Sequence, residues 1–139
     1  MTSVISVDAG ALADETWDDR ARGTLRWTTL FSAPRTPTDS LVCGIARMQP
    51  GEHFALHRHP HPEVYFGLAG EAEVLVDGQS HRLAPGIALY IPGNALHGVP
   101  RCEAPVSWFY TFAADSFNEI DYHFAHEAPA LRQTEVQDD

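Results

Sequence analysis

The sequence contains no lysine and no long apolar run. All nine basic residues are arginines, set against nineteen acidic residues, so the formal net charge is −10 at pH 7. A surface with this charge repels polyanions, which disfavours nucleic acid and anionic membranes as partners. A run of about 18 apolar residues, the length of a membrane-spanning helix, is also missing from the sequence. We therefore expect no nucleic-acid or membrane partner, and a small-molecule ligand that is cationic or zwitterionic rather than polyanionic.

Cysteine is scarce as well. Cys43 and Cys102 are the two cysteines of the chain, and two thiols are weak evidence for a disulfide. Residues 1–8 contain neither the basic region nor the long apolar region of a secretory signal. These observations predict reduced thiols and a cytoplasmic location.

What is present is a series of short strand-like segments. With 139 residues and 44% hydrophobic residues, the chain suits a single domain over residues 1–139. Asp77-Gly78 predicts a type I′ hairpin. Strands so short and closely spaced, with no long helix between them, predict an all-β barrel or sandwich. The expected strands are 25–31, 41–48, 54–59, 63–69, 71–76, 81–83, 87–91, 96–99 and 106–112.

Helical structure is expected only near the two ends of the chain. Residues 11–22 are polar and predict a short helix that Gly23 closes. Residues 115–124 predict a helical turn at Ser116 followed by extended chain. The polar tail beyond Pro129 is expected to fray.

The segment from Gly51 to Gly70 carries a group of residues that suits a metal ion. His57 and His59 are one residue apart, and on a strand such residues point to the same face. Glu63 follows beyond two prolines that bend the chain, so its carboxylate can turn back toward the same point. Histidine and carboxylate are typical ligands of first-row metals. We predict that these three residues and His97 bind one divalent transition metal.

These residues resemble the first signature motif of the cupin family. That motif reads Gly, five residues, His-x-His, three or four residues, Glu, six residues and Gly. Every position is matched, by Gly51, His57, His59, Glu63 and Gly70.

The second cupin motif is matched in part. Gly86, Pro92 and His97 agree with it, whereas Asn94 stands at the family's glycine and Arg101 at the family's asparagine. Asparagine tolerates the left-handed conformation that such a glycine usually supplies, so we expect the turn to be kept. The arginine falls outside the ligand set.

The resemblance implies a double-stranded β-helix, or jelly-roll barrel, with its core at about residues 41–112, short helical turns near the termini and the metal inside. Cupins often pair through N-terminal strands, which implies a homodimer. Four protein ligands on a metal that prefers six leave two positions for substrate or water. The ligand types accept Fe, Ni, Mn or Zn and do not choose among them.

Tyr65 is the predicted catalytic residue. It lies two residues after Glu63, so on a strand it faces the same interior. A phenol beside a divalent cation has its anionic form favoured and can act as a general base. The alternative is a packed core tyrosine.

Aromatic residues supply the predicted substrate-binding wall. Every second residue of 106–112 shares one face, and this face is largely aromatic. Aromatic faces attract cations with about 0.5–2 kcal/mol each, which suits an onium substrate. A plain hydrophobic core is the alternative. The predicted substrate-binding residues are Trp27, Trp108, Tyr110 and Tyr122.

The remaining histidines are not predicted ligands. His61 lies between two prolines in the bend, and His53 and His81 occupy exposed-looking positions. His123 and His126 lie in the C-terminal segment, where a role in a lid is an open alternative.

The whole chain is similar to the small cupin lyases that cleave dimethylsulfoniopropionate to acrylate and dimethyl sulfide. This resemblance implies that the metal binds the substrate carboxylate and that Tyr65 removes the adjacent proton. Two alternatives come from other classes: a non-haem iron dioxygenase acting on a small molecule, and a non-enzymatic ligand-binding cupin. An isomerase or epimerase is a further possibility. Turnover without oxygen distinguishes the lyase from the dioxygenase.

Overall fold

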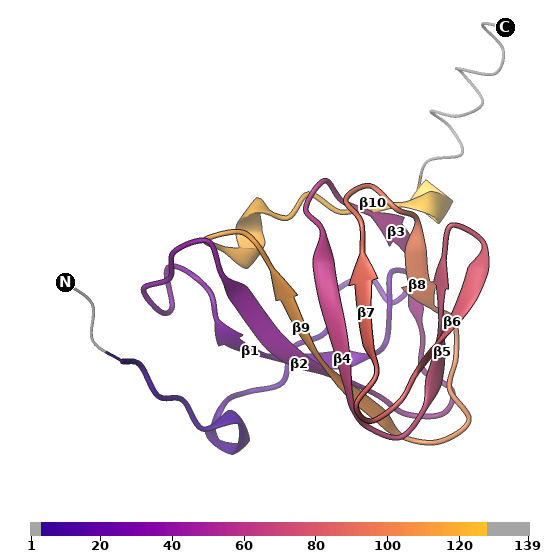
Figure 1. The fold of residues 1–139 in the computed structure, drawn as a ribbon, viewed down its shortest axis with the longest axis horizontal. Coiled ribbons are helices and arrows are strands. Elements are labelled where there is room, and N and C mark those ends of the chain that lie inside the picture. The colour runs from indigo at the N-terminus through magenta and orange to yellow at the C-terminus, as the bar shows by residue number, and fades with distance from the viewer. Residues whose placement is uncertain (1–3, 128–139) are drawn as a thin grey trace, which may run out of the picture.

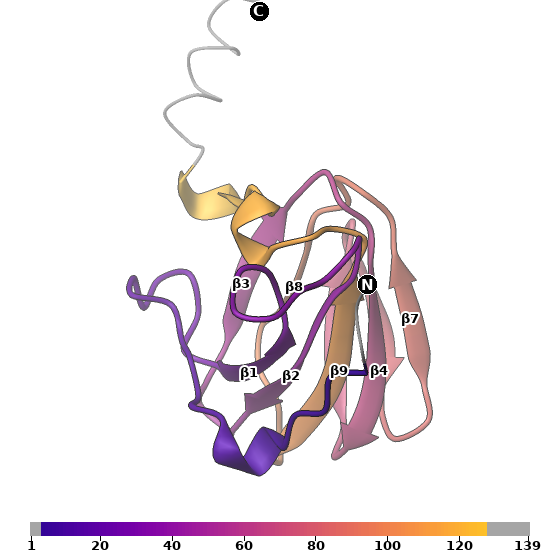
Figure 2. The ribbon, with the colours of Figure 1, turned by 90° about the vertical axis from the view of Figure 1, so that its left-hand side faces the viewer.

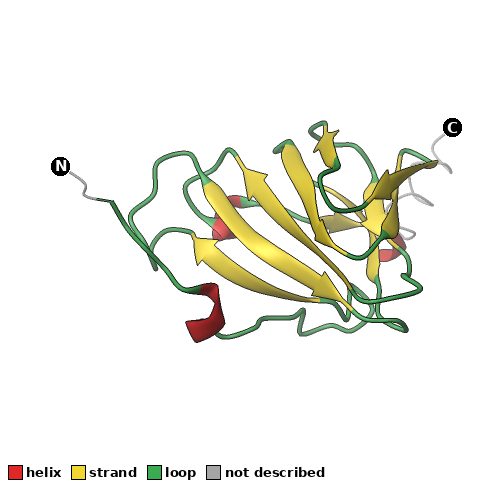
Figure 3. Cartoon of the chain, turned by 60° about the horizontal axis from the view of Figure 1, so that its bottom comes forward, coloured by secondary structure: helices red, strands yellow, loops and turns green. Residues whose placement is uncertain are grey.

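The chain folds into two five-stranded antiparallel sheets that face each other (Figure 1). The structure, a computed structural model, describes residues 4–127. The first sheet has the order β1 (Arg26–Phe31), β2 (Val42–Met48), β9 (Val106–Phe112), β4 (Glu63–Ala69) and β7 (Ala88–Ile91). The second has the order β10 (His123–Phe124), β3 (Phe54–Arg58), β8 (His97–Val99), β5 (Ala72–Val76) and β6 (Gln79–Leu83). Figure 3 shows how far strands dominate, and the predicted all-β architecture is confirmed.

The expected strands all appear, with ends that differ by two residues at most. The hairpin at Asp77-Gly78 also forms, because both residues have positive φ, 49° and 83°, as a type I′ turn requires. This turn sets the register of β5 and β6, in which Val76 faces Gln79. Asn94 has a φ of 66°, so it does adopt the left-handed conformation expected of it.

The helix predicted over residues 11–22 is wrong. Glu15 instead forms an isolated bridge with Trp27, and their backbone groups exchange hydrogen bonds of 2.7 and 2.9 Å. The segment runs along β1 so that Trp17 packs on Trp27, with ring centroids 5.4 Å apart. Burial of this tryptophan outweighs the weak local preference for helix.

The helical structure of residues 4–127 consists of three short 3-10 turns near the ends: η1 (Ala9–Ala11), η2 (Phe117–Glu119) and η3 (Ala125–Glu127). The predicted turn at Ser116 is confirmed, since its hydroxyl accepts a hydrogen bond from the Asn118 amide and caps η2. The tail beyond Pro129 lies outside the described residues. No helix in the described part of the chain is long and apolar enough to cross a membrane.

The core lies between the sheets, and strand alternation decides which side chains reach it. On β4, the residues Glu63, Tyr65 and Gly67 are buried while their neighbours are more exposed. Strand β9 buries every second residue in the same way, as predicted. Cys43 and Cys102 are free and buried, in agreement with the predicted reduced thiols.

The segment after β9 closes one end of the barrel. Residues 113–127, here called the strap, cross from the first sheet to the second along the upper edge of the molecule (Figures 1 and 2). The strap contains η2, β10 and η3, and β10 pairs with β3 through two residue pairs, His123 with Arg58 and Phe124 with His57. Its inner side faces the site described next.

Candidate metal centre

The four predicted metal ligands converge between the two sheets. Their ligating atoms all lie within 4.8 Å of one another, and all four side chains are buried. His57 comes from β3, His59 directly follows it, Glu63 begins β4 and His97 begins β8. The cluster therefore joins both sheets, and its predicted convergence is confirmed.

Backbone carbonyls fix the orientation of each imidazole. The Nδ1 atoms of His57, His59 and His97 lie 2.7, 2.8 and 2.9 Å from the carbonyl oxygens of Ala55, His61 and Ala95, respectively. A carbonyl oxygen can only accept, so each Nδ1 carries the proton and donates it. The Nε2 atoms are thereby turned toward the common centre, which is the arrangement that orients histidine ligands around a metal.

At the centre, one carboxylate oxygen accepts hydrogen bonds from two of the three imidazoles. Glu63 Oε2 lies 2.9 Å from His59 Nε2 and 2.8 Å from His97 Nε2. Burial raises the pKa of Glu63, but these two hydrogen bonds outweigh it and lower the pKa to about 2. The carboxylate is therefore anionic at neutral pH.

His57 differs from the other two histidines. Its Nε2 is buried and has no hydrogen-bond partner within the described residues. Burial, and then the nearby His97, hold the pKa of His57 well below its usual value, so its imidazole is neutral. An unpartnered, neutral nitrogen that points at an anionic carboxylate fits a divalent cation, because the cation would satisfy it. The four residues thus suit the predicted metal.

A small cavity of about 30 Å³ adjoins Glu63. Its wall is mostly aromatic and contains each residue predicted to bind substrate. The lining residues are Trp17, Leu25, Trp27, Ala46, Phe54, Glu63, Tyr65, Trp108, Tyr110, Phe112, Phe117 and Tyr122.

Comparison with known proteins identifies the family. The Cupin domain family model matches residues 44–112. The chain is 40% identical over 110 residues to the dimethylsulfoniopropionate lyase DddW of Ruegeria pomeroyi, an overlap that covers 79% of this chain and 72% of that protein. The chain belongs to the cupin family.

Solved structures agree with this cupin's fold. The polyketide cyclase RemF from Streptomyces resistomycificus superimposes with a TM-score of 0.75 at 15% identity, covering 88% of this chain and 86% of that one. The dimethylsulfoniopropionate lyase DddQ from Ruegeria pomeroyi superimposes with a TM-score of 0.64 at 26% identity. That alignment covers 87% of this cupin but 60% of DddQ, so this chain spans less than two thirds of DddQ.

Tyr65 faces the cavity of this cupin. It is 2% exposed, and its ring centroid lies 5.4 Å from that of Trp108 and 6.3 Å from that of His97. Burial, and then the negative charge of Glu63, raise the pKa of Tyr65 well above its ordinary value. Without a cation beside it, the phenol is therefore protonated.

Tyr122 brings a second phenol to the ligands, from the strap. Its ring centroid lies 5.1 Å from that of His57 and 5.0 Å from that of His59. Burial, and then Glu63, raise the pKa of Tyr122 as well. The strap therefore supplies part of the wall that stands against the buried histidine cluster.

Two aromatic residues of the wall escape the sequence patterns. Trp17 lies 5.0 Å from Tyr122 between ring centroids, and Phe117 lies 5.8 Å from it. A lone tryptophan in a polar segment is a signal for burial, since packing removes its large apolar surface from solvent. Phe117 has no such signal, because the strap's path is decided by distant contacts.

The other histidines do not join the ligand cluster. His61 contributes its backbone carbonyl to His59 rather than its ring to the centre. On the strap, His123 and His126 are exposed, and His123 Nε2 lies 3.2 Å from a carboxylate oxygen of Asp121.

Proposed function

We propose that this cupin is a metal-dependent lyase that cleaves dimethylsulfoniopropionate to acrylate and dimethyl sulfide. The observation that carries the proposal is the 40% identity with the lyase DddW, which extends over 72% of that protein. The buried His-His-Glu-His cluster and the aromatic cavity beside it support the proposal, because the substrate has a carboxylate at one end and a sulfonium at the other.

One divalent cation, Fe, Ni, Mn or Zn, would be held by His57, His59, Glu63 and His97. When bound there, such a cation withdraws electron density from a substrate carboxylate and favours the anionic form of a nearby phenol. Glu63 supplies the negative charge that holds the cation. The three backbone-anchored imidazoles would bind it through Nε2, once the Nε2 protons that His59 and His97 donate to Glu63 have been released.

Tyr65 is the proposed base. As the phenolate, its oxygen removes a proton from the carbon next to the substrate carboxylate. The electron pair of that C–H bond forms the double bond of acrylate, and the C–S bond breaks with its electrons leaving on dimethyl sulfide. The proton remains on Tyr65 until it passes to solvent. Its position two residues from Glu63, with its ring in the cavity wall, supports this role.

The aromatic wall is the proposed binding site of the substrate's sulfonium group. Aromatic faces stabilise a cation by about 0.5–2 kcal/mol each, and more strongly where water is excluded. The proposed substrate-binding residues are Trp27, Trp108, Tyr110 and Tyr122, with Tyr110 or Tyr122 as a wall residue or an auxiliary base.

The test is turnover under strict anoxia. The purified chain is loaded in turn with Fe(II), Ni(II), Mn(II) or Zn(II) and mixed with dimethylsulfoniopropionate, and dimethyl sulfide is measured in the headspace and acrylate in solution. We expect equal amounts of both products. Oxygen consumption by the iron form, with no dimethyl sulfide, would favour a dioxygenase instead. Tight metal binding without turnover of a broad panel of small acids would favour a ligand-binding cupin.

A further inference from the structure

The four clustered side chains are closed off from solvent. His57 and His97 are 0% exposed, His59 is 1% exposed and Glu63 is 4% exposed. A substrate can reach them only through an open path between the surrounding elements. Entry of a substrate therefore requires part of the wall to move.

The strap is the part of the wall that can move with least disruption. Its strand β10 is two residues long, lies at the edge of the second sheet and joins β3 through two residue pairs. In the middle of the strap, the amides of Glu119 and Ile120 bond back to Ser116 and Phe117 within the strap itself.

The beginning of the strap is held more firmly, because the Asp115 carbonyl accepts from the Ala33 amide and the Phe117 amide donates to the Ser32 hydroxyl. The part that can open is therefore 118–127, since segments with few bonds to the body of a protein open at low free energy.

Arg22 ties the end of the strap to the barrel. Its Nε and Nη2 atoms donate to the two carboxylate oxygens of Glu127 at 2.6 and 2.8 Å. Its guanidinium carbon also lies 4.9 Å from the ring centroid of Phe124 and 5.7 Å from that of Trp17. The side chains of the ion pair are 32% and 34% exposed, so water can compete for the bond and it can open and close.

The contact chain from this ion pair leads to the metal ligands. Phe124, beneath Arg22, stacks on Tyr122 with ring centroids 5.9 Å apart and planes at 16°. Tyr122 in turn lies against His57 and His59. Whatever holds Phe124 in place therefore also holds Tyr122 over the site.

We propose that the strap is a gate over the metal centre and that Arg22 and Glu127 are positioning residues that hold it closed. Opening of residues 118–127 withdraws Tyr122 from the cavity and exposes the four clustered side chains to solvent. As a route for substrate, the gate rests on the proposed function, but as a cover over the metal ligands it does not.

The first test measures how fast the zinc-loaded protein loses zinc to excess EDTA. We expect Arg22→Ala to lose it roughly two- to fivefold faster than the unaltered protein, as for the loss of one exposed bidentate pair. Exchanging the two charges, in Arg22→Glu with Glu127→Arg, is expected to restore most of the slow rate. The matched control is Arg82→Ala, which breaks an equally short ion pair with Glu71 on the β5–β6 hairpin. Equal rates in Arg22→Ala and Arg82→Ala would overturn the gate.

The second test does not depend on a bound metal. Hydrogen exchange by mass spectrometry is expected to show faster exchange of peptides covering 118–127 in Arg22→Ala, with β4 and β9 unchanged. Unchanged exchange across the strap would contradict the proposal. If the chelation and exchange results hold but no dimethyl sulfide is formed, the gate stands and the proposed lyase activity fails.

Discussion

At the scale of single residues, the site is prepared before any metal arrives. Three backbone carbonyls accept the Nδ1 protons of His57, His59 and His97, so the Nε2 atoms need no reorientation on binding. Glu63 accepts hydrogen bonds from two of these nitrogens, and among residues 4–127 His57 Nε2 has no partner. The cost of burying that nitrogen unpaired is recovered only when a cation binds.

Replacing His57 by alanine removes this nitrogen and one of four ligands. We expect metal content, measured by inductively coupled plasma mass spectrometry, to fall from about one ion per chain to nearly none, since outer partners alone are worth 10–100-fold in affinity. His81→Ala, at an exposed position of β6, is the control and should retain its metal. Unchanged stoichiometry in His57→Ala would contradict the ligand set.

Tyr65→Phe removes one hydroxyl and keeps the ring. If Tyr65 is the base, we expect dimethyl sulfide formation to fall by about 10²–10⁴-fold while metal content stays the same. Tyr90→Phe, on a tyrosine that is 68% exposed, is the matched control and should leave the rate unchanged. Full activity of Tyr65→Phe with metal bound would mean that another group takes the proton.

At the scale of elements, β4 organises the site. It lies between β9 and β7 and carries Glu63 and Tyr65 on its inner face. On the same face, Gly67 lets the turn that begins at Ala84 approach the strand, and its amide donates to the Ile87 carbonyl at 2.9 Å. A side chain at this position would collide with the backbone carbonyl of Ala84.

Gly67→Ala should therefore destabilise the protein through overpacking, by about 1–3 kcal/mol in the free energy of unfolding. Urea denaturation followed by tryptophan fluorescence measures this. At Gly78 a Cβ would meet no atom within 4 Å, so alanine is disfavoured there only by the positive φ of 83°. For Gly78→Ala we expect the free energy of unfolding to fall by about 1–2 kcal/mol. If Gly67→Ala lowered the free energy of unfolding no more than Gly78→Ala, the turn at Ala84 would be able to move away from the added methyl group.

At the scale of the whole molecule, the metal should link the two sheets. His57, His59 and His97 belong to the second sheet or its continuation, whereas Glu63 belongs to the first. A cation that binds only the folded chain adds stability by mass action, about 2.7 kcal/mol at 100 times its Kd. We expect EDTA to lower Tm by ~10 °C in differential scanning fluorimetry. The same treatment of His57→Ala should leave Tm unchanged, and a shift there would point to another metal site.

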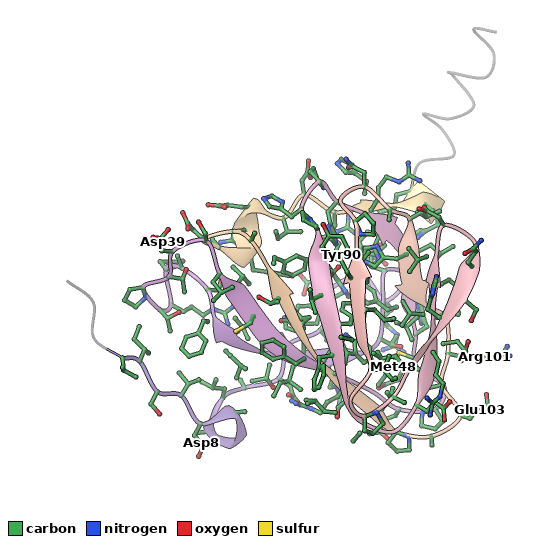
Figure 4. All side chains as sticks on the ribbon, viewed as in Figure 1. Asp8, Asp39, Met48, Tyr90, Arg101 and Glu103 are labelled. Carbon is green, nitrogen blue, oxygen red and sulfur yellow. The ribbon has the colours of Figure 1, made fainter. Side chains whose placement is uncertain are left out.

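The outer face of the first sheet bears on the predicted homodimer. Antiparallel sheets usually turn polar residues to solvent, yet Phe66, Leu68 and Tyr90 are 40%, 44% and 68% exposed. Tyr90, which Figure 4 labels, lies on β7 at the edge of this sheet. At about 150–250 Å² per aromatic side chain, the three side chains expose on the order of a few hundred Å², a size typical of interaction sites. Two cross-strand rows here contain no charged residue. One row is Ile45, Phe109, Phe66 and Ala88, and the next is Cys43, Thr111, Val64 and Tyr90.

A second copy of the chain suits this face, because two molecules of net charge −10 repel each other except where charges are absent. We expect a dimer by size-exclusion chromatography with light scattering, and a monomer for Phe66→Arg. His81→Arg, on the second sheet, is the control and should remain dimeric. A monomeric unaltered protein, or a dimer that survives Phe66→Arg, would contradict this interface.

Sequence reasoning reached the ligands and the strands because both depend on short-range spacing. Residues i and i+2 of a strand share a face in any fold, so His57 with His59, and Glu63 with Tyr65, could be paired in advance. The prediction failed at residues 11–22. Their polar sequence favoured a short helix, but Trp17 packs on Trp27 at the edge of the core instead. The roles of Tyr65 and of the aromatic wall remain proposals, since position alone does not determine chemistry.

The amino-acid sequence by itself determined the strands, the hairpin at Asp77-Gly78 and the shared direction of His57 and His59, because each follows from local spacing and backbone preference. His97 was reached through the second cupin motif, and the role of the four residues as metal ligands stays a prediction.

Only the tertiary structure decided the cavity's size, the place of Tyr122 over the imidazoles and the pairing of Arg22 with Glu127. That ion pair joins residues 105 positions apart, and no local pattern specifies a contact at such a separation. It forms because the strap crosses the barrel end and buries its aromatic residues there.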